Sequence, residues 1–360
     1  MRIIVLGGGL FGLATALHLK KLGNEVLLLE KEKDILTKAS KINQNRIHFG
    51  YHYPRSRDTA SQSLNGIVSF YHYFKDAIRT NFDNYYLISK ESSNLNAKQF
   101  ISFCDELCIS HQDSYPDRQY VNQDAIEASF LVREPIFDYL YIKRILKQLI
   151  VESKLEIVND IDIKAIDFNG KTFNITSKDS KIYESDFVIN ATYSDVNDVL
   201  SLVDSSLNLK FQDVVLPIFK SSVRVGLTLM DGPFCSVLPK GSSISHSILS
   251  NVKYSILAES DTKSNLSSVK SSPQYIAEHV RNIYFESSKY FPFLRDVTHS
   301  YNWRTVKALP INNDDARVSE IYRHPYLSNF ITILSGKVTT CWKIAFEVGA
   351  IINNQNSYLI

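Results

Sequence analysis

A glycine motif close to the start of the chain limits the fold more than any other feature. Gly7, Gly9 and Gly12 lie between the apolar run Ile3–Val5 and a stretch with helical spacing of leucine and alanine. In such a motif the first glycine makes a tight turn, the second lets the backbone approach a pyrophosphate, and the third lets helix pack closely on strand. With a second apolar run at Val26–Leu29, it predicts a β-α-β unit with a phosphate site at the helix N-terminus.

Glu30 stands directly after the second predicted strand. A carboxylate at this position can accept hydrogen bonds from both ribose hydroxyls of an adenosine, and it would repel a 2′-phosphate, so NADP is not expected. The unit by itself does not distinguish FAD from NAD. A tight glycine turn without any ligand is the plainer alternative.

The composition excludes several classes of partner. The 360 residues contain 40 basic and 38 acidic side chains, a net charge of +2, which gives no reason to expect nucleic acid or a membrane surface as partner. No apolar stretch of about 18 residues is present, so no transmembrane segment is expected. The four cysteines suggest neither a disulfide framework nor a zinc site. We therefore expect no metal site. We also expect a cytoplasmic protein, because no charged leader with an apolar segment opens the chain.

The polar segment after the β-α-β unit carries the first resemblance to a known family. Glu30-Lys31 is followed by Ala39-Ser40 and by the run Arg46-Ile47-His48-Phe49-Gly50-Tyr51. This arrangement resembles the segment that passes the FAD ribityl chain and flavin ring in the D-amino-acid-oxidase-like flavoprotein superfamily. Residues 47–51 are most similar to its 2-hydroxyglutarate oxidase/dehydrogenase branch.

Two later segments resemble the same superfamily. Phe187–Thr192 looks like the strand that ends in Asn-Ala beside the FAD, although Thr192 stands where a glycine is usual. Leu334–Thr340 resembles the Gly-Gly-Lys-x-Thr-Thr motif of FAD-linked glycerol-3-phosphate dehydrogenases, with Ser335 in place of the first glycine. There a strand turns into the last helix, whose N-terminus would stabilise negative charge on the reduced flavin.

The resemblance implies FAD as the cofactor and a site assembled from these distant segments. The residues expected to contact FAD are Gly7, Gly9, Leu10, Phe11, Gly12, Glu30, Lys31, Ser40, Asn43, Arg46, Ile163, Ala191, Thr192, Gly336, Lys337, Val338, Thr339 and Thr340.

The order of predicted elements, taken with this resemblance, gives the fold class α/β: a Rossmann-like FAD-binding domain with an inserted antiparallel α+β substrate domain. We expect the FAD-binding domain to comprise residues 1–60, 135–200 and 305–360. The substrate-binding domain would comprise residues 61–134 and 201–304. Amphipathic spacing predicts helices at 61–80, 97–109, 139–151 and 273–290, and the Ser-, Asn- and Lys-rich residues 259–273 are predicted to form a surface loop.

The candidates for the chemistry are His48, Arg46, Tyr51 and Arg304, with His52 and Lys307 as weaker ones. His48 could act as a base near neutral pH. Arg304 could bind a substrate carboxylate through paired donors, as an arginine in this general region does in related oxidases. The alternatives are that Arg46 and His48 only hold their loop by hydrogen bonds, and that Arg304 forms a surface ion pair.

These observations lead to one preferred function and two alternatives. The preferred function is an FAD-dependent oxidase or dehydrogenase that moves a hydride to flavin N5 from a small polar substrate with a hydroxyl or amine and an anionic group. Electrons would then pass to oxygen or to a carrier. The alternatives are a monooxygenase-like or other flavoenzyme acting on a sugar or sugar-nucleotide metabolite, and a non-catalytic FAD-binding subunit. The chain has no second G-x-G-x-x-G for a pyridine nucleotide, which counts against the monooxygenase.

Overall fold

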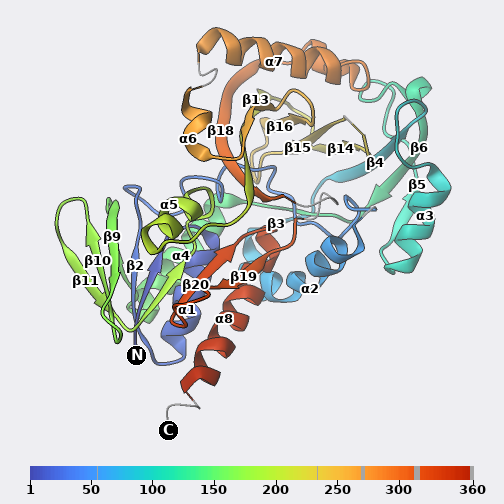
Figure 1. Cartoon of the computed structure of the whole chain (residues 1–360). Helices are drawn as coiled ribbons and strands as arrows, with labels where there is room; N and C mark the ends of the chain where they lie inside the picture. Colours follow the sequence, from blue (N-terminus) through green and yellow to red (C-terminus); the bar gives the residue numbers. More distant parts are fainter. Residues whose placement is uncertain (55, 233, 269–271, 312–316, 357–360) are drawn as a thin grey trace.

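The computed structural model describes residues 1–54, 56–232, 234–268, 272–311 and 317–356 (Figure 1). Within them the chain forms one largely parallel and one largely antiparallel sheet, with two smaller sheets beside them. The strands of the parallel sheet are, in order, β19 (Glu320–Arg323), β20 (Phe330–Leu334), β12 (Phe187–Asn190), β1 (Arg2–Leu6), β2 (Glu25–Leu29) and β8 (Glu156–Val158). β19 runs antiparallel to β20, and the other neighbouring pairs are parallel.

Both faces of the parallel sheet are covered. The helices on one face are α1 (Leu10–Lys21), α2 (Arg57–Phe74), α4 (Tyr139–Ser153) and α8 (Cys341–Asn356). The elements on the other face are β9 (Ile163–Phe168), β10 (Phe173–Ser177), β11 (Ile182–Ser185) and α5 (Val196–Leu200). Val5 packs towards the first group and Ile4 towards the second, which explains why β1 is apolar from Ile3 to Leu6. The predicted β-α-β unit of β1, α1 and β2 is confirmed.

The antiparallel sheet forms the second part of the molecule, drawn above the first in Figure 1. Its strands are, in order, β17 (Ile256–Ser260), β13 (Leu209–Lys220), β16 (His246–Asn251), β15 (Cys235–Pro239), β14 (Val225–Leu229), β4 (Asp83–Ser89), β6 (Ile126–Val132) and β5 (His111–Asp113), with β18 (His299–Pro310) also paired to β13. The helices packed on it are α3 (Ala97–Glu106) and α7 (Pro273–Ser287). The β4–β14 pair is parallel. The fold class is therefore as predicted, a Rossmann-like part joined to a largely antiparallel α+β part.

The prediction of a surface loop at residues 259–273 is wrong in its first half. β17 continues to Ser260, and a short helix, α6 (Lys263–Ser268), follows. Leu266 is 4% exposed and packs into the core on the α5 side of the parallel sheet. One buried leucine among polar residues is enough to anchor a helix of this length, and too weak a pattern to predict one. Residues 269–271 lie outside the described part of the chain.

Helix α2 belongs by its packing to the parallel part. Phe70 and Phe74 are fully buried in one core with Trp342 of α8. The division predicted from the sequence assigned residues 61–134 to the substrate-binding domain. We propose instead that residues 57–77 are counted with the parallel part, because the apolar face of α2 covers α8.

We predict that Gly66→Ala destabilises the protein. A Cβ at residue 66 would lie 2.7 Å from the carbonyl oxygen of Thr339, so α2 and the turn before α8 would have to move apart. Overpacking of this kind costs about 1–3 kcal/mol, against a gain of about 1 kcal/mol from replacing a helical glycine by alanine. Urea unfolding measures the change. Asn65→Ala, on the exposed side of α2, is the control, and equal free energies of unfolding for the two variants would contradict the prediction.

Candidate functional site

The motifs found in the sequence meet along one edge of the parallel sheet. β20, β12, β1 and β2 are parallel neighbours, so their carboxyl ends lie side by side. Gly336, Ala191, Gly7 and Glu30 come just after these four strands, in that order across the edge. Segments separated by up to 330 residues in the sequence therefore build one site, at the edge where open parallel sheets bind ligands.

The first turn of this edge requires glycine at two positions. Gly7 has φ +103°, and a Cβ there would lie 2.7 Å from the carbonyl oxygen of Ala191. A Cβ on Gly12 would overlap the carbonyl oxygen of Gly7. The two glycines let α1 approach β1 and β12 closely, and this directs the start of α1 at the sheet edge.

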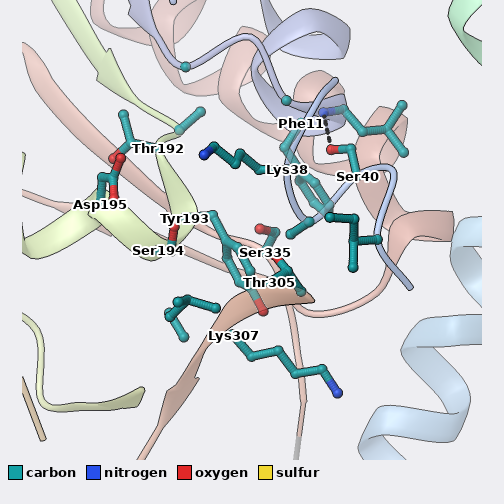
Figure 2. A pocket seen from close by; sticks show the side chains of 18 of the residues that line it. Phe11, Lys38, Ser40, Thr192, Tyr193, Ser194, Asp195, Thr305, Lys307 and Ser335 are labelled. Carbon is teal, nitrogen blue, oxygen red and sulfur yellow. Dashed lines mark hydrogen bonds between the residues drawn. The ribbon is translucent and has the colours of Figure 1, made fainter. Parts of the chain in front are cut away.

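The N-terminus of α1 is suited to an anion. Its N-cap, Gly9, carries no side chain to satisfy the first amides, and the first turn contains no acidic residue. The amide of Leu10 donates to the hydroxyl of Ser40 over 2.9 Å, shown as the dashed line in Figure 2. The positive end of the helix dipole is thus left for a phosphate, with Ser40 beside it.

Glu30 is fixed at the end of β2. One carboxylate oxygen accepts from the amide of Gly8, and the other accepts from the amide of Glu32 over 2.7 Å. Burial raises the pKa of Glu30, and the two backbone hydrogen bonds oppose this shift. The carboxylate is thus held in place at the rim of the site.

A single large cavity of about 870 Å³ runs along this edge. Most of the residues predicted for the cofactor line it: Gly7, Gly9, Leu10, Phe11, Glu30, Lys31, Ser40, Asn43, Arg46, Ile163, Ala191, Thr192, Gly336, Lys337 and Val338. Gly12, Thr339 and Thr340 are not among its lining residues. Thr340 instead donates to the carbonyl oxygen of Lys337 over 2.8 Å, so it shapes the turn beneath the cavity.

The inserted part of the chain supplies the other wall. Figure 2 shows Thr305 and Lys307 of β18 on the side of the cavity opposite Phe11 and Ser40, and Tyr193, Ser194 and Asp195 on the 3-10 turn after β12. At the α5 end, Lys263 of α6 bonds to Asp195 and, over 3.1 Å, to Asp198. The contribution of Lys263 was not expected, because residues 259–273 were predicted as a loop.

Arg46 lines the cavity, but its guanidinium is engaged in a buried network. It donates to Glu134 over 2.8 Å, to the hydroxyl of Tyr86 over 2.6 Å and to Thr228 over 2.8 Å. The side chains of Arg46 and Glu134 are 1% and 0% exposed. This fits the alternative in which Arg46 holds its loop. Glu134, which completes the ion pair, lies in no recognised motif, and nothing in the sequence pointed to it.

Tyr51 lies on the wrong side of its loop for the chemistry predicted for it. It is 1% exposed, is absent from the cavity lining, and donates its hydroxyl to the carbonyl oxygen of Ser110 over 2.5 Å. Gly50, with φ +97°, turns the chain so that the side chain of Tyr51 enters the core beside Tyr86. Tyr51 therefore packs, and Tyr53, two residues further on, lines the cavity instead.

Arg304 lines the cavity and forms an ion pair with Asp213. Its Nε donates to the two carboxylate oxygens of Asp213 over 2.9 and 3.0 Å, across the β13–β18 pair. Asp213 is 6% exposed at the side chain and Arg304 is 36% exposed. The expected role in binding a substrate carboxylate does not fit a guanidinium already engaged in this way.

A group of cations occupies the cavity at the β18 end instead. Lys307, Arg317 and Lys337 all line it. Burial and then the charge of Arg317 lower the pKa of Lys307 to about 7. Burial, Arg317 and Lys307 lower the pKa of Lys337 well below its ordinary value, and its ammonium donates to the hydroxyl of Tyr53. Burial is the larger cause for both lysines, and the positive charge of Arg317 adds to it in each case.

Two imidazoles stand beside these cations. His48 and His52 line the cavity with ring centroids 5.7 Å apart, and each packs against Tyr53 at 5.3 Å. Burial, followed by nearby positive charges, lowers the pKa of both rings well below the ordinary value. Both are therefore neutral at pH 7 and can accept a proton.

Other kinds of site find little support in the described residues. They contain no group of three or more His, Cys, Asp or Glu side chains placed to hold a metal ion. In the same residues no helix is both long and apolar enough to span a membrane. Burial raises the pKa of Cys104 and Cys235 to about 12, which leaves these two thiols protonated.

The geometry fits FAD. A volume of about 870 Å³ is at the upper end of the range of about 300–1,000 Å³ typical of ligand sites. Four adjacent strand ends span about 14 Å, at about 4.8 Å per strand spacing, which suits an extended dinucleotide. The uncapped start of α1, the fixed carboxylate of Glu30 and the close turn at Gly336 lie where the sequence motifs placed the phosphate, ribose and flavin segments.

Two fungal proteins are similar in sequence. The FAD-dependent monooxygenase FPY4 of Fusarium mangiferae is 23% identical over 366 residues, covering 98% of this chain and 91% of that protein. The FAD-dependent monooxygenase kojA of Aspergillus flavus is 40% identical over 70 residues, covering 19% of this chain and 16% of that protein.

Two solved structures share the fold. Glycine oxidase from Geobacillus kaustophilus has a TM-score of 0.77 at 11% identity, covering 98% of this chain and 95% of that chain. L-alpha-glycerophosphate oxidase from Mycoplasma pneumoniae, solved with FAD bound, has a TM-score of 0.73 at 14% identity, covering 98% of this chain and 94% of that chain. The family of FAD dependent oxidoreductases, DAO, matches residues 2–330. The chain belongs to this family of FAD-dependent enzymes, as its strand-end motifs predicted.

Proposed function

We propose that this enzyme oxidises a small anionic substrate at a carbon that bears a hydroxyl or an amine. The observation that carries the proposal is the cluster of Lys307, Arg317 and Lys337 at one end of the cavity. These like charges destabilise one another, and an anionic group placed among them would relieve the repulsion. A carboxylate or phosphate on the substrate is the natural partner for lysine and arginine.

The cofactor would be held by the residues along the sheet edge. We infer that the start of α1 and Ser40 bind the pyrophosphate, and that Glu30 accepts the ribose hydroxyls. The turn at Gly336–Val338 and the start of α8 would hold the other end. When bound, FAD supplies a two-electron acceptor for the hydride of the substrate.

The proton of the substrate needs an acceptor inside the cavity. His48 is neutral, lines the cavity and lies next to the cation cluster. As the substrate is oxidised its C–H hydrogen leaves as hydride, its O–H or N–H proton goes to His48, and a carbonyl or imine remains. In this proposal the cations orient the substrate, and the imidazole of His48 accepts the O–H or N–H proton of the substrate.

A monooxygenase is the second candidate, because FPY4 carries that description and aligns with 98% of the chain. The two functions are separated by anaerobic mixing of the FAD-loaded enzyme with a panel of hydroxy acids, amino acids and sugar derivatives, followed by admission of oxygen. Bleaching of the flavin by a substrate without added pyridine nucleotide supports the proposal. A flavin that stays oxidised with the panel, but is reduced by NADH or NADPH with oxygen entering the product, supports the monooxygenase. The rate of reoxidation in air then distinguishes oxygen from a carrier as acceptor.

We predict that Glu30→Ala weakens FAD binding by about 1.5–3 kcal/mol, since charge-assisted hydrogen bonds to the ribose are lost. Titration of the apoprotein with FAD, followed by flavin fluorescence, measures the dissociation constant. Glu25→Ala, an exposed position at the start of the same strand, is the control. Unfolding of both apoproteins shows whether the unpaired amides of Gly8 and Glu32 also lower stability. An unchanged FAD affinity would mean that the ribose does not lie at Glu30.

We predict that substrate affinity falls as the pH rises through about 7. Lys307, whose pKa is lowered to about 7, is a cation below that pH and neutral above it, so the anion loses a partner. Because one proton is lost from Lys307, the substrate affinity should fall by at most about tenfold per pH unit. Lys307→Met should bind weakly at every pH and show no step near 7. Lys220→Met, an exposed lysine at the end of β13, should keep the step, and a step that survives in Lys307→Met would contradict the assignment.

We predict that His48→Ala slows flavin reduction by about 10²–10⁴-fold, because a positioned proton acceptor acts in the transition state. The dissociation constant of the substrate should change little in comparison. Stopped-flow absorbance of the flavin without oxygen gives both quantities. His72→Ala, on the exposed side of α2, is the control, and normal reduction in His48→Ala would remove this residue from the reaction.

A further inference from the structure

Glu134 lies between β6 and β7 (Ile136–Phe137) and has no part in the motifs of the family. Its side chain is 0% exposed, so its charge must be compensated inside the protein. One oxygen, Oε2, accepts from Arg46 over 2.8 Å and from the hydroxyl of Tyr86 over 2.6 Å. The other oxygen, Oε1, accepts from the amide of Phe49 over 3.0 Å. The carboxylate is thus held rigidly, with the charge of Arg46 on one side only.

The free side of this carboxylate faces His48. Nδ1 of His48 lies 3.7 Å from Oε1 of Glu134, and Nδ1 is buried without a hydrogen-bond partner. The side chain of His48 is 17% exposed and lines the cavity, so the ring meets the cavity with its opposite edge, which carries Nε2. The imidazole therefore stands between a buried carboxylate and the substrate space.

This placement decides which nitrogen carries the proton. A neutral imidazole has one N–H donor and one nitrogen with a lone pair. A lone pair at Nδ1 would face a negative oxygen in a medium of low polarity, whereas an N–H at Nδ1 would point its positive end at that oxygen. At 3.7 Å the contact is too long for a hydrogen bond, so the preference comes from the charge of Glu134 acting on the N–H dipole.

We propose that Glu134 is a positioning residue that holds His48 as the Nδ1–H tautomer, and so makes Nε2 of His48 the proton acceptor of the cavity. The inference rests on the proposed function only for what the acceptor does. The same division of roles, an acid that orients the far nitrogen of a histidine, recurs wherever a histidine must present one chosen nitrogen.

The ring stays neutral in spite of the carboxylate. Glu134 alone would raise the pKa of His48, but burial and the positive charges of Lys337, Arg46 and Arg317 lower it well below the ordinary value. Arg46 bonds Oε2, so Oε1 still acts on the imidazole at close range and orients it, while burial and the charge of Arg46 itself act against its protonation. His52 offers an internal comparison. Its Nδ1 is also buried without a partner, but no acidic side chain of the described residues lies within ion-pair distance of it, so its tautomer is not set in this way.

The test is the ¹⁵N NMR spectrum of the FAD-loaded enzyme labelled at histidine, with the His48 signals assigned from their loss in His48→Asn. We expect the Nδ1–H tautomer of His48 to predominate by about tenfold, which corresponds to about 1.4 kcal/mol. In the double variant Arg46→Met/Glu134→Gln, which removes both buried charges together, the excess should fall below about threefold. The tautomer ratio of His52 should stay as in the parent enzyme, whereas its signals should shift, because the charge of Arg46 contributes to its lowered pKa.

The paired variant Arg304→Gln/Asp213→Asn removes a different ion pair of the cavity and should leave the His48 tautomer as in the parent enzyme. A predominant Nε2–H tautomer in the parent enzyme would overturn the inference, and this measurement needs no variant of Glu134 to fold. An unchanged excess in the double variant would also overturn it. The proposed function is tested separately, by the rate of flavin reduction in His48→Ala. The two tests are independent, because the NMR spectrum shows the tautomer of His48 without any substrate.

Discussion

The close packing of Gly12 on Gly7 is the contact on which the site depends. A side chain at either position would push α1 away from β1 and β12, because the carbonyl oxygens of Ala191 and Gly7 occupy the space that a Cβ needs. With α1 held so near, its uncapped N-terminus lies at the level of the strand ends, next to Ser40. The proposed anion site at the start of α1 would therefore be a consequence of backbone packing, and would need no charged side chain of its own.

A second constraint joins the two halves of the molecule. Arg46 comes from the loop after β2, whereas Tyr86, Glu134 and Thr228 belong to the antiparallel sheet or its connections. Removing one partner of a buried ion pair leaves an uncompensated charge and costs about 3–5 kcal/mol. The polar loop that carries His48 and His52 is thus held against the inserted part, and the two imidazoles keep a fixed place between the sheets.

The sequence was informative where local chemistry decides the structure. The glycine turn, the acid at Glu30 and the Ser335–Thr340 turn each follow a buried strand, and parallel strands bring such ends together. Prediction from the sequence was wrong where a single residue, or a change in the direction of a side chain, determines the local structure. Leu266 alone converts a polar stretch into α6, and Gly50 turns Tyr51 into the core and leaves Tyr53 at the cavity. Glu134 and Asp213 could not be predicted as partners of Arg46 and Arg304, because each pairing spans about 90 residues and depends on tertiary packing.

The charges of the cavity are compatible with the proposed function, in which one cavity holds both a proton acceptor and an anionic substrate group. A histidine beside an anionic substrate would ordinarily gain a proton and lose its ability to accept one. Here burial is the largest cause that keeps the pKa of His48 low before the anion arrives, and the charges of Arg46, of Arg317 and of Lys337 in its protonated form add to it. Burial first, and then nearby positive charge, also lowers the pKa of Lys307 and Lys337 and so favours their neutral forms. An incoming anion therefore restores charge first to the lysines, whose intrinsic proton affinity is higher, and leaves the imidazole neutral for the chemistry.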